Sequence, residues 1–309
     1  MTEVHLLSDA DALGAATAVT IGKFDAIHLG HQALLATLID VAEEHDLQSV
    51  VFTFGNHPNA VLSPNQIPLP VIGDGQRLSL LEAAGVDAVI TVAFDSEFAS
   101  MPPESFFTDY LVGNLGAKFV IVGEGFRFGA GGAGSIETLR SLGETHAVEV
   151  IEVPSVLIDG VIASTTNVRK ALDSGDVKLA ARLLGRNHET TGIVEHGLKI
   201  GRTIGFPTAN MSREAEGYLP IDGVYAGWLH SEGERYPAAL SVGINETFQA
   251  VPRLIEAHVL DRNDLDFYDK IVTLEYVDFI RPVAKFDGVE SLVAQINLDI
   301  DEVRAKLLL

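Results

Sequence analysis

The sequence predicts two domains of different architecture: an α/β domain with a parallel sheet covered by helices on both faces, and an antiparallel sheet or small β-barrel that ends in a helix. Three observations support this prediction. The first half alternates short apolar runs with amphipathic stretches, the second half places β-rich runs one after another, and 309 residues correspond to about two domains of typical size.

The first half contains short apolar runs, rich in Val, Ile and Phe, that predict buried strands: Ala18–Ile21, Val50–Phe54, Ala88–Phe94, Phe119–Val122 and Val148–Val153. Amphipathic stretches between them predict helices: Gln32–Glu44, Gln76–Ala84, Glu104–Leu115 and Ile136–Glu144. Strands and helices in alternation are typical of a parallel sheet, which binds ligands beyond the carboxyl ends of its strands. We therefore expect functional residues directly after the apolar runs.

The pattern changes in the second half. Ser164–Ser174 and Val177–Arg186 predict two short helices. β-rich runs then follow without helices between them, which indicates an antiparallel sheet or small barrel: Thr190–Val194, Val224–Leu229, Ala238–Ile244, Arg253–Leu260 and Lys270–Phe279. Apolar residues from Val289 to Val303 recur at helical spacing. We place the boundary near Arg186, which gives domains over 1–186 and 187–309.

Composition narrows the class of protein. The chain has 21 Lys and Arg against 43 Asp and Glu, a net charge of −22, which argues against a nucleic acid or an anionic membrane as partner. The absence of Cys excludes disulfides and thiolate metal sites. The acidic N-terminus does not resemble a signal peptide, and no apolar stretch approaches the ~20 residues that span a bilayer. We expect a cytoplasmic protein.

The first candidate site follows the first predicted strand. Gly22, Lys23, Phe24 and Asp25 lead into His28-Leu29-Gly30-His31, which opens a helix. A helix N-terminus favours anions, two imidazoles can stabilise charge that develops on oxygen, and Gly30 allows backbone to approach a phosphate. The pattern favours attack on the α-phosphate of a nucleotide. The alternatives are a zinc site or ordinary turn and cap residues.

Three further groups lie where strands end or a helix begins. A turn with a Phe and a His follows the second apolar run, and a Phe-Arg-Phe string follows the fourth apolar run. A segment rich in hydroxyl side chains begins the predicted helix after residue 163. Their members are Phe54, His57 and Pro58; Phe126, Arg127 and Phe128; and Ser164, Thr165, Thr166 and Arg169. Ser164 or Thr165 can cap the helix, and Arg169 can bind phosphate one turn later. Together they suggest phosphate donors beside an aromatic wall.

The second candidate site is the string from Gly201 to Asn210. In an extended segment the side chains of Thr208 and Asn210 point the same way, and their oxygens suit Mg²⁺ that carries ATP phosphates. Pro207 fixes the backbone, and Gly205 leaves room for a nucleotide. The alternative is a turn into an edge strand whose Thr and Asn make only local hydrogen bonds.

These segments, in order along nearly the whole chain, resemble the bifunctional riboflavin kinase/FAD synthetases of bacteria. The resemblance implies a Rossmann-like nucleotidyltransferase domain that adenylylates FMN to FAD with release of pyrophosphate, and a barrel domain that phosphorylates riboflavin with MgATP. Flavins are then substrate and product rather than prosthetic groups. The resemblance also implies that Glu256 is the base for the ribityl hydroxyl, and that the kinase nucleotide site includes Gly201, Arg202, Gly205, Phe206, Pro207, Thr208, Asn210 and Tyr225.

Some positions depart from the family pattern. Ala26 replaces a usual Gly, Asn56 a usual Pro, Gly125 a usual Asn or Asp, and Ile162 a usual Arg. In the second half, Glu246 replaces a usual Pro, and Phe267-Tyr268-Asp269 replaces a usual Leu-Tyr-Gly turn. The changes at 125 and 162 fall in the transferase half. They leave two alternatives open: a paralogue that keeps one activity, most plausibly the kinase, or a flavin or nucleotide binder without catalysis.

Overall fold

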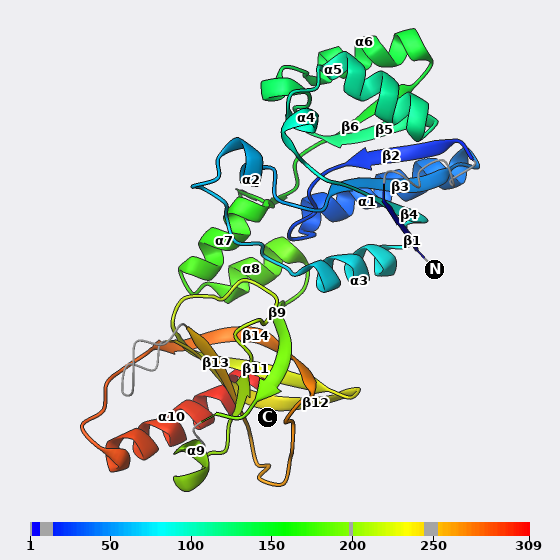
Figure 1. Ribbon diagram of the computed structural model, residues 1–309. Coiled ribbons are helices and arrows are strands. Elements are labelled where there is room, and N and C mark those ends of the chain that lie inside the picture. The colour runs from blue at the N-terminus through cyan, green and yellow to red at the C-terminus, as the bar shows by residue number, and fades with distance from the viewer. Residues whose placement is uncertain (1, 7–14, 198–199, 244–252) are drawn as a thin grey trace. The chain divides into compact units, whose positions relative to one another are not determined.

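A computed structural model describes residues 2–6, 15–197, 200–243 and 253–309. The chain forms two compact units (Figure 1). The first unit contains residues up to 69 and 75–163, and the second contains 70–74 and 164–309.

The first unit is built on a parallel sheet. Its strands are β1 (Glu3–Leu6), β2 (Thr17–Ile21), β3 (Gln48–Phe54), β4 (Ala88–Val92), β5 (Ala117–Gly123) and β6 (Glu149–Val153), arranged in the order β1-β4-β3-β2-β5-β6. The chain passes from β2 to its neighbour β3, whereas β5 pairs with the other edge of β2. The strand order therefore reverses at β2, and ligands of such sheets bind beyond the carboxyl end at this reversal.

Helices cover both faces of this sheet, because strands buried on both sides carry apolar residues throughout. Figure 1 shows α1 (Leu29–Glu44) and α6 (Ile136–His146) on opposite faces. Alternate strand residues such as Val19 and Phe52 join a core with the π-helix η2 (Phe106–Asn114). The remaining elements are α2 (Asn59–Leu62), α3 (Asp74–Ala84), α4 (Ser96–Ala99), α5 (Pro103–Ser105), η3 (Ala130–Gly132), β7 (Leu157–Ile158) and β8 (Val161–Ile162).

The second unit is a closed antiparallel barrel. Its strands are β9 (His188–Glu195), β10 (Ala209–Met211), β11 (Gly223–Ser231), β12 (Glu234–Gly243), β13 (Leu254–Val259) and β14 (Ile271–Pro282), in the order β10-β13-β12-β11-β14-β9. A short helix, α9 (Ile200–Thr203), precedes β10. Buried and partly buried residues alternate along β13, as expected for strands with one face toward the barrel interior.

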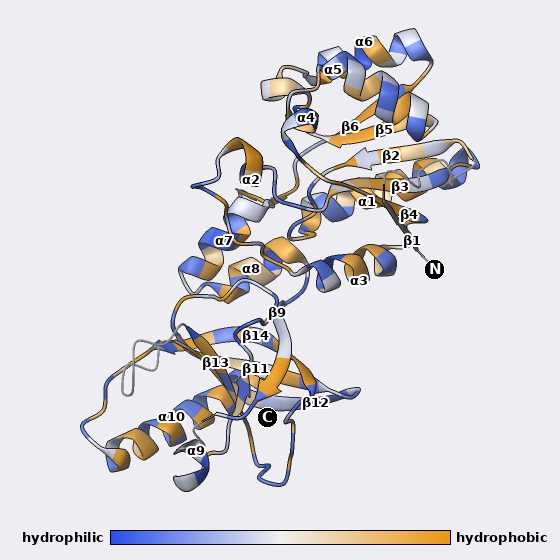
Figure 2. Ribbon diagram, in the orientation of Figure 1, coloured by the Kyte–Doolittle hydropathy of each residue, from blue (hydrophilic) through white to orange (hydrophobic). Residues whose placement is uncertain are grey.

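Helices are attached to the outside of the barrel. The last helix, α10 (Val289–Leu307), alternates apolar and polar residues (Figure 2) and is tied to β14 by two hydrogen bonds of 2.8 and 2.7 Å between Arg281 and the buried Asp299. Two further helices, α7 (Thr165–Asp173) and α8 (Val177–Leu184), also belong to this unit. Lys178 of α8 lies 2.6 Å from Asp278 of β14.

The predicted fold class is confirmed: a parallel sheet with helices, then an antiparallel barrel that ends in a helix. The structure adds β1 and the three-residue β10, and it forms a π-helix over most of the segment 104–115, for which an ordinary amphipathic helix was expected. Of the predicted strand 238–244, Ile244 lies outside the described residues, as does Glu246. The boundary at residue 186 stays a prediction.

Candidate active sites

The His-x-Gly-His segment lies at the carboxyl end of β2 and begins α1. His28 is the N-cap of α1, and its Nδ1 accepts a hydrogen bond of 3.3 Å from the backbone N–H of His31. The two imidazole rings stack with centroids 3.7 Å apart. The segment therefore stands at the strand-order reversal, where the sheet topology predicts a ligand site.

His31 has the electrostatics of a neutral imidazole. Burial, with a smaller contribution from His28, holds the pKa of His31 well below its usual value. Its Nδ1 is buried and has no hydrogen-bond partner among the described residues. A buried polar atom without a partner is costly, which makes this nitrogen a candidate for contact with a ligand.

Two glycines shape this segment. A Cβ at Gly30 would meet His28 Cε1 at 3.0 Å and the carbonyl oxygen of Ala163 at 3.1 Å, and one at Gly22 would meet the Phe24 ring at 3.0 Å. The space that a side chain at Gly30 would need is thus filled by protein atoms, and the approach of a phosphate to Gly30 stays a prediction. Phe24 and Ile27 adopt positive φ angles of 51° and 42°, which is strained for such residues and typical of functional loops.

The other residues of the segment are held inside the loop. Asp25 is only 4% exposed and lies 3.6 Å from the Lys23 ammonium. Ala26 is fully buried and has no positive φ, so this loop accepts Ala where Gly is usual. The predicted residues from Gly22 to His31 therefore form one loop, whose side chains are held by contacts within the loop.

The predicted aromatic wall is partly core. The Phe126 and Phe128 rings stack at 5.8 Å, and Phe128 is 7% exposed. Phe54 packs edge-on against Phe94 and Phe98 at 5.3 and 5.8 Å. Phe126 and Phe54 are half-buried, Arg127 is exposed, and Phe128 is a core residue.

Two departures from the family pattern have local explanations. Asn56 exchanges two hydrogen bonds of 2.8 and 2.7 Å with the backbone of Phe94, which fixes the turn before His57 and Pro58. His57 Nδ1 accepts the N–H of Asn59 at 2.9 Å. Gly125 has a φ of +74°, a conformation that Asn and Asp also tolerate, so this turn is compatible with the usual residue although the polar side chain is absent here.

The hydroxyl-rich segment begins α7 as predicted. Ser164 is its N-cap, and the Oγ accepts the N–H of Asn167 at 3.3 Å. Thr165, Thr166 and Arg169 lie in the first two turns of this helix, which belongs to the second unit. Their participation in the site of His28 stays a prediction.

In the barrel, the string that ends at Asn210 brings two predicted residues together. Asn210 Nδ2 lies 3.3 Å from Thr208 Oγ1, which confirms that both side chains point the same way. The Asn210 amide packs over Gly197, where a Cβ would lie 2.6 Å from Oδ1. Asn210 is directly opposite Glu256 in the pairing of β10 with β13. Directly opposite residues of an antiparallel pair share one face, so Thr208, Asn210 and Glu256 lie together.

Glu256 has the protonation behaviour of a candidate base. Burial alone raises the pKa of its carboxyl group. A raised pKa makes the carboxylate a better proton acceptor near neutral pH.

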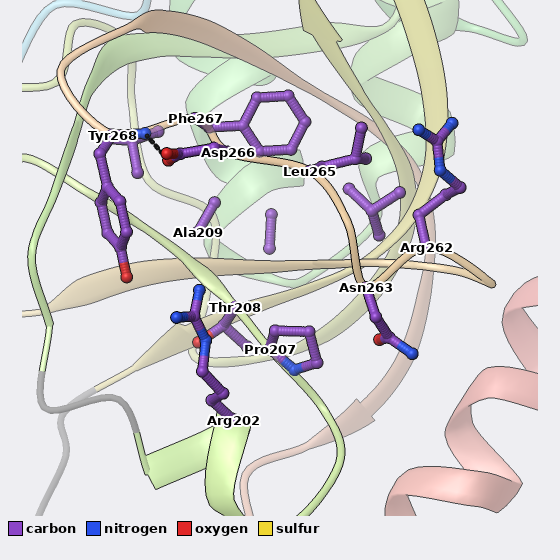
Figure 3. A pocket seen from close by; sticks show the side chains of 13 residues that line it. Arg202, Pro207, Thr208, Ala209, Arg262, Asn263, Leu265, Asp266, Phe267 and Tyr268 are labelled. Carbon is purple, nitrogen blue, oxygen red and sulfur yellow. Dashed lines mark hydrogen bonds between the residues drawn. The ribbon is translucent and has the colours of Figure 1, made fainter.

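Two adjoining pockets open beside this cluster and share Arg202, Pro207, Thr208 and Tyr268. Figure 3 shows the Arg202 guanidinium beside Thr208, with the Tyr268 hydroxyl directed to the same side. The lining of the larger pocket includes the apolar residues Val194, Ala209, Ala257 and Val259 and the polar residues Arg262, Asn263 and Asp266. An apolar lining with a few cationic and polar groups fits a nucleotide.

Of the other residues predicted for the kinase site, two glycines are explained by the backbone, and Tyr225 lies away from the pockets. A Cβ at Gly201 would meet the Phe206 carbonyl oxygen, and Gly205 has a φ of +92°, so both glycines are required by the backbone. Tyr225 does not reach the pockets: it is fully buried in the barrel, and its hydroxyl donates to the Ile221 carbonyl. The pocket residues from Arg262 to Tyr268 carry no sequence motif that marks them as a site, apart from the aromatic Phe267-Tyr268 pair.

The donor set fits Mg²⁺ bound together with ATP. Among the described residues no group of three His, Asp or Glu could hold a metal, so these side chains do not form an all-protein cage. Mg²⁺ in nucleotide sites typically takes one or two protein oxygens and completes its shell with phosphates and water. Thr208 Oγ1 and Asn210 Oδ1 can supply two oxygens after rotation of the Asn210 amide, since Nδ2 now lies nearer Thr208.

Comparison with known proteins is consistent with both sites. A family model described as FAD synthetase matches residues 11–167, and one described as riboflavin kinase matches residues 184–307. The bifunctional riboflavin kinase/FMN adenylyltransferase of Escherichia coli strain K12 is 34% identical over 297 residues, which cover 96% of this chain and 94% of the relative. The chain belongs to this bifunctional family.

Further relatives agree. The Haemophilus influenzae bifunctional riboflavin kinase/FMN adenylyltransferase is 33% identical and covers 99% of both chains. A solved structure from Streptococcus pneumoniae, described as a macrolide-efflux protein, superposes with a TM-score of 0.88 at 33% identity and covers 97% of this chain and 98% of its own. No helix in the described part of this chain is long and apolar enough to cross a membrane. The prediction of an enzyme with a FAD synthetase and a riboflavin kinase domain is confirmed.

Proposed function

We propose that the barrel pocket is the riboflavin kinase site. Thr208 and Asn210 hold Mg²⁺ with the ATP phosphates, and Arg202 binds the outer phosphates. The bound cation would neutralise charge on the transferring phosphoryl group. Glu256 takes the proton of the ribityl 5′-hydroxyl as that oxygen bonds to the γ-phosphorus; the bond to the β-γ bridging oxygen breaks, and ADP leaves. The observation that carries this proposal is the pairing of Glu256 opposite Asn210.

The loop from Gly22 to His31 is the adenylyltransferase site in this proposal. His28 and His31 stabilise the α-phosphate of ATP while the FMN phosphate oxygen bonds to it and pyrophosphate leaves. The FMN phosphate is already ionised, so no general base is needed. The unpartnered Nδ1 of His31 and the N-terminus of α1 support an anion here.

Supporting roles follow for the remaining predicted residues. Lys23, Phe24, Asp25 and Gly30 shape the phosphate loop, Ser164, Thr165, Thr166 and Arg169 add phosphate contacts, and Phe54, His57, Pro58, Phe126 and Arg127 face the flavin. ATP, riboflavin and FMN are the partners, in the cytoplasm where MgATP is abundant. The net charge of −22 disfavours nucleic acids and anionic membranes.

Product analysis of two variants tests this proposal. Each protein receives riboflavin or FMN with MgATP, and flavins are separated by chromatography. His28→Ala should reduce FAD formation at least about 100-fold and leave FMN formation unchanged. Glu256→Gln should reduce FMN formation by about 100-fold or more and leave FAD formation from supplied FMN unchanged. Loss of both activities in either variant would contradict two separate sites.

A further inference from the structure

His258 connects the strand of the candidate base with the segment that leads to Thr208. Its Nδ1 lies 2.8 Å from the carbonyl oxygen of Pro207, and its ring meets the Phe206 ring edge-on at 5.5 Å. Because a carbonyl oxygen can only accept, Nδ1 carries the proton and donates. His258 is two residues after Glu256 on β13, so both side chains leave the strand on the same face.

This hydrogen bond stands where the backbone ladder ends. The pairing of β10 with β13 includes Ala209 with Ala257 and Asn210 with Glu256, and β10 begins at Ala209. Continued in the same register, it would place Thr208 opposite His258. Pro207 has no N–H to donate, so the ladder cannot continue through it in the ordinary way. The imidazole instead holds the carbonyl that directly precedes Thr208.

We propose that His258 is a positioning residue of the kinase site, which fixes the backbone at Pro207 and thereby the Thr208 hydroxyl. This inference rests on the proposed role of Thr208 and Asn210. Before the amide rotates to present Oδ1 to a cation, Asn210 Nδ2 lies 3.3 Å from both the carbonyl oxygen and Oγ1 of Thr208, and this contact is lost on rotation. The His258 hydrogen bond to the Pro207 carbonyl does not depend on that rotation, so it can hold the segment before Thr208 in both states.

We expect the loss of the His258 imidazole to change the kinetic constants for MgATP and not those for riboflavin. Without the imidazole, the segment before β10 is held by fewer contacts, and Thr208 Oγ1 departs from the position that the cation and phosphates require. An error of about 1 Å in such a group can cost on the order of 100-fold in rate. Riboflavin binding depends on Thr208 only indirectly, so its KM should change little.

The full-length protein with His258→Ala and His258→Asn tests the proposal. An Asn amide nitrogen stands close to the place of Nδ1 and can donate to the same carbonyl. For His258→Ala we expect the KM for MgATP and the Mg²⁺ concentration at half-maximal rate to rise about 10-fold, with less than about 2-fold change in the riboflavin KM. His258→Asn should restore both values to within about 3-fold.

Two further variants distinguish a failure of the proposed His258 role from a failure of the proposed cation site. His230→Ala removes a barrel histidine whose Nε2 bonds Glu275 at 2.7 Å, and it should leave the kinase constants unchanged. Unchanged kinetics in His258→Ala, or equal losses in the Ala and Asn variants, would overturn the positioning role while Thr208→Ala still lacks kinase activity. An active Thr208→Ala would instead refute the proposed cation site, and this inference with it.

Discussion

At the residue scale, Gly30 shows how the lack of a side chain determines the geometry of the loop that leads into α1. His28 can cap α1 and stack on His31 only because its ring occupies the space where a side chain at residue 30 would begin. The Ala163 carbonyl limits the same space from another direction, at 3.1 Å. A methyl group would therefore have to displace either the imidazole or the backbone.

We predict that Gly30→Ala impairs FAD synthesis and spares the kinase. The added Cβ would move the His28 ring by several tenths of an ångström, which weakens its cap hydrogen bond and the contact with substrate that we propose for it. A loss of about 10- to 100-fold in kcat/KM for FMN adenylylation is expected, measured by pyrophosphate release. Gly288→Ala, where a Cβ meets nothing within 4 Å, is the matched control. Full transferase activity in Gly30→Ala would show that the ring of His28 does not need this position.

At the element scale, β9 is joined to the loop before β11 by a buried histidine. His188 begins β9, is 1% exposed, and its Nε2 donates a hydrogen bond of 2.6 Å to the Tyr218 carbonyl. Its Nδ1 is buried without a partner among the described residues. Burial lowers the pKa of His188 to about 4, because a second proton would have to sit on that isolated nitrogen.

Because of His188, we expect the free energy of unfolding of the barrel to decrease at acidic pH. The unfolded chain binds the proton with a pKa of about 6.5 and the folded chain with one of about 4, so the unfolded state takes up more protons between these values. The stabilisation is complete above pH 6.5 and is lost as the pH falls toward 4. Between pH 7 and pH 5 it amounts to about 2 kcal/mol.

Urea denaturation followed by fluorescence measures this effect. The sequence has a single Trp, Trp228 on β11, so its emission reports on the barrel. His188→Gln keeps a donor toward Tyr218 and removes the titrating group. We expect the variant to lose about 2 kcal/mol less stability than the parent between pH 7 and pH 5. Parallel pH profiles for the two proteins would rule out His188 as the source.

At the scale of the whole molecule, the longer strands could be predicted from the sequence, whereas the shortest strand of the barrel could not. The apolar runs identified most sheet strands because burial on both faces leaves a compositional signal. β10 has three residues and leaves no such signal, although the same segment places Asn210 opposite Glu256. Tyr225 is buried in the barrel, which the sequence cannot show, because a Tyr in a motif does not reveal whether it faces a ligand or the barrel core.

The assignment of α7 and α8 depends on long-range contacts that sequence periodicity does not show. Ile221 donates its backbone N–H to the Leu172 carbonyl of α7 at 3.0 Å, and the Tyr218 hydroxyl donates to Asp173 at 2.8 Å. The ion pair between Lys178 and Asp278 attaches α8 to β14. Both helices were predicted correctly as helices, but these contacts group them with the barrel and not with the preceding sheet.

This grouping predicts different stabilities for two fragments. Residues 164–309 retain α8, whose Leu183 and Leu184 are fully buried, whereas residues 187–309 lose it and expose apolar surface that it covers. Each such side chain contributes about 1.5–3 kcal/mol, so the shorter fragment should melt about 10 °C lower or fail to fold. Differential scanning calorimetry and Trp228 emission measure this directly. Equal melting temperatures would place the folding boundary near residue 186 and make α7 and α8 additions to the barrel rather than parts of it.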